Sequence, residues 1–331
     1  MSITFKQYHP VKTGLAVLFM LLFLACIGLL AWASYKGATV HGPIHIAANA
    51  ARVCVTLNDE ILVLDTHGAL QERHTLDALG VSGYPIDLRL QDDGTLLIAT
   101  QRPAGLFMCA SPYWQCQVVE SPLFEQLRTQ IKVLRDPGGE DLFVSDTAGG
   151  RLHRLSADGQ NVRGLTAVGQ FRRVNDIALD QKRRLWVADS GNRRIAILQP
   201  DANGDWAMTG ELSARTELAR PGLDWPMMIA LSPDGNAWVV QPDALGESAD
   251  LLIYDAQQGV KARINLLDDA HPTDVAHSGN SMLVTDRDAF RIQRVDIDTH
   301  AVKPFGDQGV QVILDAAAGE NARADRMMDL A

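Results

Sequence analysis

Six residues open short apolar segments that recur along the sequence, and most of their side chains could bind a ligand or do chemistry at a common centre. In chain order they are His45, Asp87, Lys132, Asp176, Met228 and Asp274. If the recurring segments surround a common axis, these six residues face the mouth of a central channel. Their three carboxylates, one ammonium and one imidazole could then hold a small polar ligand or a loop of another protein. The alternative is a water-filled funnel in which these groups satisfy one another.

Other catalytic signatures do not occur in the sequence. It contains no Gly-x-Ser-x-Gly elbow, no His-Glu-x-x-His, no phosphate-binding loop and no Cys-x-x-Cys. The nine histidines are scattered, and we predict that His271 and His277, on either side of Asp274, are surface or packing residues. A catalytic site would therefore have to be built from the recurring polar residues.

A repeated unit must position these residues. Each copy has a strand with an apolar triplet, and the third residues of these triplets are spaced by 43, 46, 43, 52 and 45 positions. They are Val55, Ile98, Val144, Val187, Val239 and Val284. One strand precedes each triplet and another follows it, so each unit has the length of a four-stranded blade. We predict an all-β fold, a six-bladed β-propeller of four-stranded blades over residues 43–308.

One unit also carries a family pattern. Residues 174–198, VNDIALDQKRRLWVADSGNRRIAIL, resemble an NHL repeat, most specifically in VADSGNRRI. The resemblance covers residues 41–306, strongly in this unit and loosely in the other five. It implies an NHL-type propeller in which Asp146, Asp189 and Asp286, the acidic residues of the repeated triplet, pair with backbone near the blade edge.

The same superfamily includes gluconolactonase and regucalcin-like hydrolases, which hold a divalent metal in the channel on a Glu, an Asn and an Asp. At the matching positions this sequence has His41, Met228 and Asp274, while Asn175 and Asp176 match an Asn-Asp pair with a substrate role. Because calcium needs several oxygen ligands, the usual site should be lost. A softer metal on His41 and Asp274 would have only two ligands. We predict no cofactor, with a divalent metal as the alternative.

A hairpin in the second unit carries two cysteines. Cys109 and Cys116 bracket Ala-Ser-Pro-Tyr-Trp-Gln and could form a disulfide in an oxidising compartment; the alternative is two reduced strand cysteines. Tyr113 and Trp114 lie at the predicted tip. Exposed there, they would form a contact with a protein or a membrane.

The N-terminal region predicts a membrane anchor. Residues 14–34, GLAVLFMLLFLACIGLLAWAS, contain no charged residue and are long enough to span a bilayer as a helix. The alternative is a signal peptide, because Ala31-Trp32-Ala33 resembles a cleavage site. More lysine before the span than after it places residues 1–13 in the cytoplasm, and residues 35–42 would link the anchor to the propeller.

Charge and glycosylation signals favour a bacterial envelope. The chain has a net charge of −10, a poor match for nucleic acid, and no Asn-x-Ser/Thr acceptor. We predict a single-pass protein of the bacterial inner membrane with its propeller in the periplasm. Its partners would be the membrane and envelope or inner-membrane proteins.

Two functional hypotheses follow. The first is a binding or scaffolding module for a protein or a small polar ligand. The second is a lactonase-like or other hydrolase with an altered channel site built on Asn175, Asp176, Asp274 and His41. The missing Glu and Asn ligands favour the first hypothesis, so that enzymatic activity is not expected. Residues 309–331 are predicted to form one more strand, at 310–316, and a tail.

Overall fold

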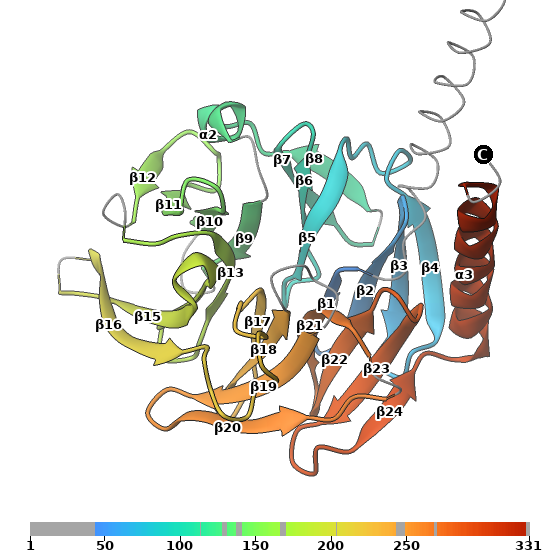
Figure 1. Cartoon of the computed structure of the whole chain (residues 1–331). Helices are drawn as coiled ribbons and strands as arrows, with labels where there is room; N and C mark the ends of the chain where they lie inside the picture. The colour runs from blue at the N-terminus through green and yellow to red at the C-terminus, as the bar shows by residue number, and fades with distance from the viewer. Residues whose placement is uncertain are drawn as a thin grey trace, which may run out of the picture.

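Six antiparallel sheets of four strands each surround a central axis in the computed structural model (Figure 1). It describes residues 44–328 apart from 113, 128–130, 137–140, 166–169, 203, 243–248 and 268–269. The predicted six-bladed propeller is confirmed. The predicted anchor at residues 14–34, its flanking segments and His41 lie outside the described residues. Within the described part of the chain, no helix has both the length and the apolar character needed to cross a membrane.

Each blade consists of four consecutive strands that run from the axis outward. The innermost strands are β1 (Ile46–Ala48), β5 (Tyr84–Leu90), β9 (Ile131–Arg135), β13 (Val174–Leu179), β17 (Met228–Leu231) and β21 (Pro272–Ser278). The second strands are β2 (Arg52–Leu57), β6 (Leu96–Gln101), β10 (Leu142–Asp146), β14 (Leu185–Asp189), β18 (Ala237–Pro242) and β22 (Ser281–Asp286). The third strands are β3 (Glu60–Asp65), β7 (Gly105–Ala110), β11 (Arg151–Leu155), β15 (Arg194–Pro200), β19 (Ala249–Asp255) and β23 (Arg291–Asp296). The outermost strands are β4 (Leu70–Thr75), β8 (Gln115–Val118), β12 (Val162–Gly164), β16 (Trp206–Ser213), β20 (Gly259–Ile264) and β24 (Val302–Phe305).

Tight turns join the first and second strands of several blades. In the fifth blade, Ser232 and Gly235 close a turn by a backbone hydrogen bond of 2.9 Å, and Gly235 has a φ of +84°. A residue with a β-carbon is strained in this left-handed conformation, so glycine suits the position. Gly94 in the second blade has the same φ and the same role.

The hydrophobic core is divided into six clusters, and each cluster lies at one junction between neighbouring blades. The second strands are the most deeply buried, because blades cover both of their faces. Trp186 and Trp238, at equivalent places in β14 and β18, are fully buried there. Their indole nitrogens donate to Asp180 and Ser232, at matching positions of the turns beside them. A core of this kind exists only when the blades stack.

The acidic residues that end three of the second strands hold the adjacent turns. The Asp189 carboxylate accepts the backbone N–H of Arg172 at 2.8 Å and pairs with Arg194 at 2.8 Å. Asp286 accepts the N–H of Ala289 at 3.3 Å and pairs with Arg291, and Asp146 accepts the N–H of Gly149. The structural role that the NHL resemblance implied for these residues is confirmed.

Two short helical turns lie in loops, η1 (Ser190–Asn192) and α2 (Pro122–Gln126), and a long helix follows the last blade. The predicted strand at residues 310–316 is wrong, because this segment belongs to helix α3 (Gln308–Met328). Asp307 caps the helix by accepting the N–H of Val310 at 2.9 Å. Val310, Leu314 and Ala317 pack into the cluster shared by the first and last blades, and α3 lies alongside β4 (Figure 1). The helix therefore covers the junction where the ring closes.

Candidate functional site

The six polar or sulfur-containing residues predicted at the channel mouth lie at the start of the innermost strands, but they are buried. Their exposed fractions run from 1% for Asp176 to 7% for His45 and Met228. The sequence placed them around an open mouth. In the structure they form a closed layer across the axis, because the blades meet around them and their polar groups pair with one another.

The three aspartates of this layer tie each even-numbered blade to the next blade. The Asp87 carboxylate accepts the N–H of Val133 at 2.9 Å, and Asp176 accepts that of Ile229 at 2.9 Å. Asp274 of the last blade accepts the N–H of Ile46 in the first at 3.1 Å, which joins the two ends of the ring. In each of these three blades the inner strand has a register shift just before the aspartate. Such a bulge can aim a side chain out of the regular pleat.

Three basic groups complete the layer. Lys132 donates from Nζ to the Ile86 carbonyl at 2.7 Å and to Asp87 at 3.3 Å. Arg89 donates from Nε to Asp87 at 3.2 Å and from Nη2 to Asp176, and so bridges the second and fourth blades. His45 Nδ1 lies 3.5 Å from Asp274 Oδ2 and makes no hydrogen bond within the part of the chain that the structure describes. We name these six residues, Asp87, Lys132, Arg89, Asp176, His45 and Asp274, the central charge layer.

Burial and neighbouring charges set the protonation of this layer. Burial raises the pKa of Asp176 to about 6, against the opposing charges of Arg89 and Lys132. Burial raises the pKa of Asp274 as well, but the adjacent His45 imidazole and the charges of Lys132 and Arg89 bring it below the usual value. Burial and Lys132 lower the pKa of His45, so its ring is neutral at pH 7. Three carboxylates then face two cations, an excess of one negative charge.

Arg89 is the functional residue that the sequence analysis missed. Side chains two positions apart on a strand share a face. The residues two positions after the predicted ring are Ala47, Arg89, Leu134, Ala178, Ala230 and Ala276. The four alanines have small side chains and leave space beside the axis. Arg89 extends from this second set of residues to the carboxylates of Asp87 and Asp176. The signal was present in the sequence, because only one of these six positions carries a charge.

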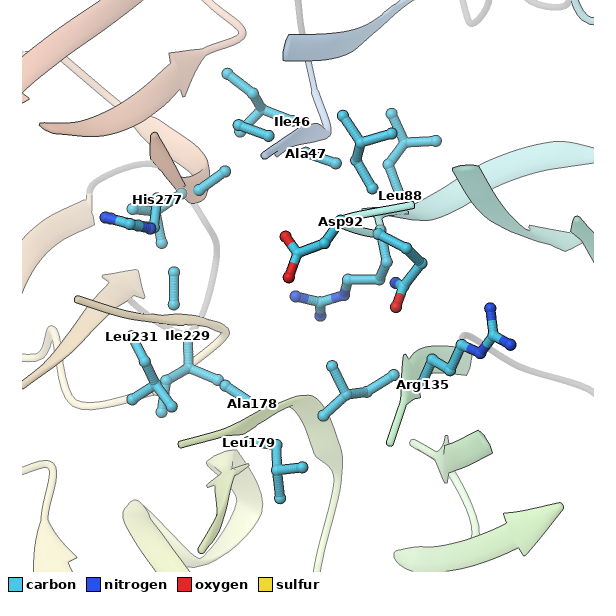
Figure 2. Close-up of a pocket in the computed structure, with 18 of the residues that line it drawn as sticks. Ile46, Ala47, Leu88, Asp92, Arg135, Ala178, Leu179, Ile229, Leu231 and His277 are labelled. Atoms are coloured by element: carbon cyan, nitrogen blue, oxygen red, sulfur yellow. The ribbon is translucent and has the colours of Figure 1, made fainter. Parts of the chain in front are cut away.

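A cavity of about 520 Å³ lies next to the central charge layer, where the innermost strands end (Figure 2). Its walls include Ala47, Ala178, Ala230 and Ala276, and Arg89 also lines it. The volume is typical of a small-molecule site. Each innermost strand is an edge strand of its sheet, so its outer N–H and C=O groups are not used in the blade ladder.

The rim of the cavity is polar. Exposed Asp92 directs its carboxylate toward the centre of the opening, with Arg135 and His277 on other sides of it (Figure 2). Arg135 pairs with Asp93 at 3.3 Å, whereas Asp92 has no ion pair with any described residue. His277, predicted as a surface or packing residue, lines the cavity and contacts the Gly279 carbonyl at 2.8 Å. His271 lies apart from the cavity and pairs with Asp288 at 3.2 Å.

Two of the positions matched to the metal ligands of gluconolactonase-like enzymes, Met228 and Asp274, are described by the structure, and they do not fit a calcium site. Both oxygens of Asp274 accept backbone N–H groups, and Met228 offers a thioether, a poor ligand for a hard cation. Asn175 donates to the Ser190 hydroxyl at 2.7 Å, and Asp176 pairs with Arg89. No group of three or more His, Cys, Asp or Glu side chains among the described residues is arranged to hold a metal ion.

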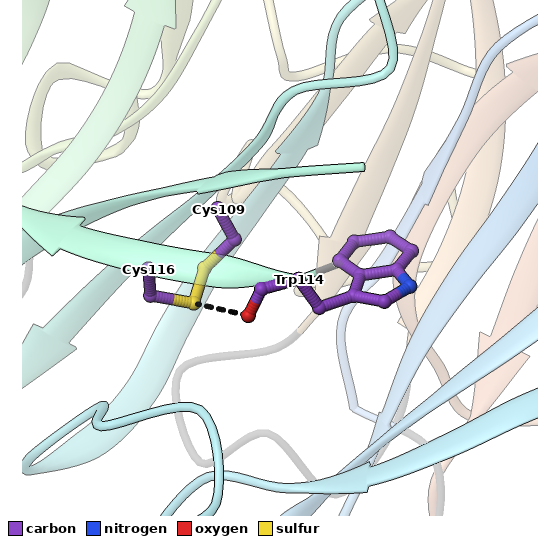
Figure 3. Close-up of a disulfide and its surroundings, with 3 residues drawn as sticks. All are labelled: Cys109, Trp114 and Cys116. Atoms are coloured by element: carbon purple, nitrogen blue, oxygen red, sulfur yellow. Dashed lines mark hydrogen bonds between the residues drawn. A yellow bond between two sulfur atoms is a disulfide. The ribbon is translucent and has the colours of Figure 1, made fainter. Parts of the chain in front are cut away.

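The disulfide between Cys109 and Cys116 is present, across neighbouring positions of β7 and β8. The predicted exposed tip is wrong for Trp114, which is only 4% exposed, and Tyr113 lies outside the described residues. The Trp114 ring extends away from the disulfide (Figure 3) and donates from Nε1 to Glu72 of the first blade at 2.6 Å. It lies in the cluster between the first two blades, because burying an indole with its N–H paired is favourable.

Comparisons with known proteins agree with this fold. No family model matches the chain. The chain is 26% identical over 271 residues to NHL repeat-containing protein 3 of Mus musculus, an alignment that covers 67% of this chain and 76% of that protein. It is therefore a homologue of an NHL-repeat protein.

Solved structures show the same architecture at low identity. A virginiamycin B lyase from Staphylococcus aureus, crystallised as an inactive variant with quinupristin, superimposes with a TM-score of 0.54 at 17% identity, covering 82% of this chain and 86% of the lyase. A protein proposed to be a gluconolactonase gives a TM-score of 0.58 at 14% identity, covering 80% and 90%. A chain of a nidogen–laminin complex gives 0.56 at 14% identity, covering 82% and 94%. At these identities the likeness concerns the fold alone.

Proposed function

We propose that this protein is a binding module that holds a small polar ligand in the cavity at the end of its innermost strands. One observation carries the proposal. The cavity is large enough for a ligand, it is open at a polar rim, and it ends on a guanidinium with donors to spare. Arg89 uses Nε and Nη2 on carboxylates, while Nη1 makes no hydrogen bond to any described residue. A guanidinium has five N–H donors, so Nη1 can serve a ligand.

The central charge layer itself supports binding better than catalysis. Its carboxylates already accept hydrogen bonds from neighbouring blades, and its cations are paired with them. Groups held in this way fix the ring and orient Arg89. In the cavity beside this layer, Arg89 Nη1 and the Asp92 carboxylate are available to form hydrogen bonds with a ligand.

A ligand screen with a blocked variant tests this function. Thermal melting of the purified full-length chain would be measured with a panel of small polar compounds. Asp92→Trp places an indole at the centre of the opening from an exposed position, so it should block the cavity without disturbing the fold. Asp77→Trp, on an exposed loop between β4 and β5, is the matched control. A ligand should raise the Tm of wild type and Asp77→Trp but not of Asp92→Trp. Equal stabilisation of all three would refute the cavity as the site.

A hydrolase remains the second candidate, and Asp176 is the observation that favours it. A carboxyl group with a pKa of about 6 is suited to exchange protons near neutral pH. It is 1% exposed, so a substrate would have to displace Arg89 to reach it. Assays of lactone and ester hydrolysis with wild type and Asp176→Asn test this candidate. Activity that disappears in the variant while the Tm is retained would support it.

We also infer that the propeller is tethered to a membrane on its outer, periplasmic side. The uncharged run at residues 14–34 supports this proposal, and only a short segment separates it from β1. The disulfide between Cys109 and Cys116 agrees with an oxidising compartment. Protease treatment of intact and permeabilised bacterial spheroplasts tests the orientation. Degradation of the propeller in intact spheroplasts is expected, and protection there would contradict it.

A further inference from the structure

We propose that the ligand of the cavity is an amino sugar, and that a second sugar unit extends into the groove between the fourth and fifth blades. This inference rests on the proposed function and names the chemical class of the ligand. Three features of the cavity carry it: an unpaired carboxylate at its centre, a surplus of hydrogen-bonding groups on its walls, and a continuous groove that leaves it.

The charge around the cavity favours a cationic ligand. The Asp92 carboxylate points into the opening, and Arg135 on the rim is paired with Asp93. Asp136, a buried lining residue, is paired with Arg183 at 2.6 Å. The central charge layer adds one more uncompensated negative charge. An ammonium group placed beside Asp92 would therefore be stabilised by both, through a charge-assisted hydrogen bond to Asp92.

The walls favour a ligand with many hydroxyl groups. A sugar presents donors and acceptors around its ring and apolar C–H groups on its faces. The N–H groups of Ile46, Val133 and Ile229 on the edges of the innermost strands already donate to aspartates. The remaining N–H and C=O groups of these edges lie outside the blade ladders, and Arg89 Nη1 offers a donor to a neutral oxygen. An anionic group of the ligand is not expected on Arg89, because the carboxylates of Asp87 and Asp176 already balance its charge. The alanine side chains provide small apolar surfaces against which a sugar face can lie.

A groove of about 440 Å³ continues from the cavity between the fourth and fifth blades. The cavity and the groove share Leu179, Leu231 and His277 as lining residues. The groove also contains three carboxylates, those of Asp180, Asp234 and Asp255, and two basic side chains, Lys182 and Arg184. Arg184 is paired with Asp180 at 2.6 Å. Desolvation raises the pKa of Asp180 and of Asp234, but hydrogen bonds outweigh it and bring both pKa values below the ordinary range. Backbone N–H groups of Gln257 and Gln258 lower the pKa of Asp255. The groove therefore has one more carboxylate than basic side chains, and this excess can take a further amine-bearing unit.

The test measures binding of defined sugars by isothermal titration calorimetry with the full-length chain. The probes are glucosamine and its β-1,4-linked disaccharide, and the matched neutral probes are glucose and cellobiose. The disaccharide with two amines should bind more tightly than glucosamine. Each of these two amino-sugar probes should bind about tenfold to hundredfold more tightly than its neutral analogue. Asp92→Asn keeps the size of the side chain and should remove most of the preference of glucosamine over glucose. Asp77→Asn, far from the cavity, should leave it unchanged.

The outcomes separate this inference from the proposed function. Equal binding of glucose and glucosamine, with both blocked in Asp92→Trp, would overturn the amino-sugar assignment and keep the cavity as a site. The same holds if screening finds a ligand without an amine that is blocked in Asp92→Trp. Binding of glucosamine that survives in Asp92→Trp would overturn both. A preference for the amine that is unaffected by Asp92→Asn would refute the role given to this carboxylate.

Discussion

Removal of the Asp87 carboxylate tests whether the central charge layer holds the ring together. In the structure this side chain accepts hydrogen bonds from Lys132 Nζ, Arg89 Nε and the Val133 N–H at 3.3, 3.2 and 2.9 Å. Asp87→Ala would leave the Lys132 ammonium buried with only the Ile86 carbonyl as a partner. It would also leave the backbone N–H of Val133 without its acceptor.

The expected cost follows from these contacts. Breaking a buried ion pair by removing one partner costs about 3–5 kcal/mol, and most of this cost is the uncompensated charge that remains. For a domain of this size, about 2–4 °C of Tm is lost per kcal/mol, so Asp87→Ala should melt roughly 6–20 °C lower. An exposed pair gives the contrast. Glu211 pairs with Arg194 at 2.7 Å but its side chain is 60% exposed, so Glu211→Ala should cost less than about 1 kcal/mol.

Urea unfolding followed by circular dichroism measures both variants, together with Lys132→Met and the double variant Asp87→Ala/Lys132→Met. The double variant removes both charges. Its loss of unfolding free energy should be smaller than the sum of the two single losses by at least about 2 kcal/mol, because neither charge is left without its partner. The central charge layer does not hold the ring together if Asp87→Ala costs no more than Glu211→Ala, or if the effects of Asp87→Ala and Lys132→Met add.

Three further predictions concern pH, the disulfide and the C-terminal helix. Because the pKa of Asp176 is raised in the folded state, its contribution to stability is fully present at low pH and is lost as pH rises from about 4 through 6. The unfolding free energy of wild type minus that of Asp176→Asn should therefore fall by up to about 3 kcal/mol over this range. A difference that does not change with pH would contradict the raised pKa. Replacing both Cys109 and Cys116 by Ser should cost about 2–3 kcal/mol for a loop of this length, and a reductant should lower the Tm of wild type only. Leu314→Ala on the buried face of α3 should lower the unfolding free energy by about 2–5 kcal/mol. Val312 is 67% exposed, so Val312→Ala should change it by no more than about 0.5 kcal/mol. Similar losses in the two variants would mean that α3 does not pack on the blades.

The fold could be predicted from the sequence because a propeller repeats one local pattern six times. The apolar triplets marked the second strand of every blade, and the residue that opens each innermost strand followed from the register. The closing helix was missed for a local reason. Val310, Val312 and Leu314 alternate like a strand, but Val310, Leu314 and Ala317 also fit one helix face, and Asp307 supplies a cap.

The site was predicted only in part, because burial and pairing depend on contacts between blades. The sequence placed Asp87, Asp176 and Asp274 at the axis, but not their bonds to the N–H groups of the following blade. Arg89 and the alanines beside it could have been found by continuing the register two residues further. The burial of Trp114 could not, since its partner Glu72 belongs to another blade, 42 positions earlier in the chain.

The most direct test of the account is a crystal structure of the protein with a ligand that stabilises it in the thermal screen. We predict that the ligand lies in the cavity at the end of the innermost strands, with an oxygen on Arg89 Nη1 and its polar end at Asp92. A ligand at the other end of the channel, where the innermost strands begin, or on the outer face of the blades would contradict the proposal.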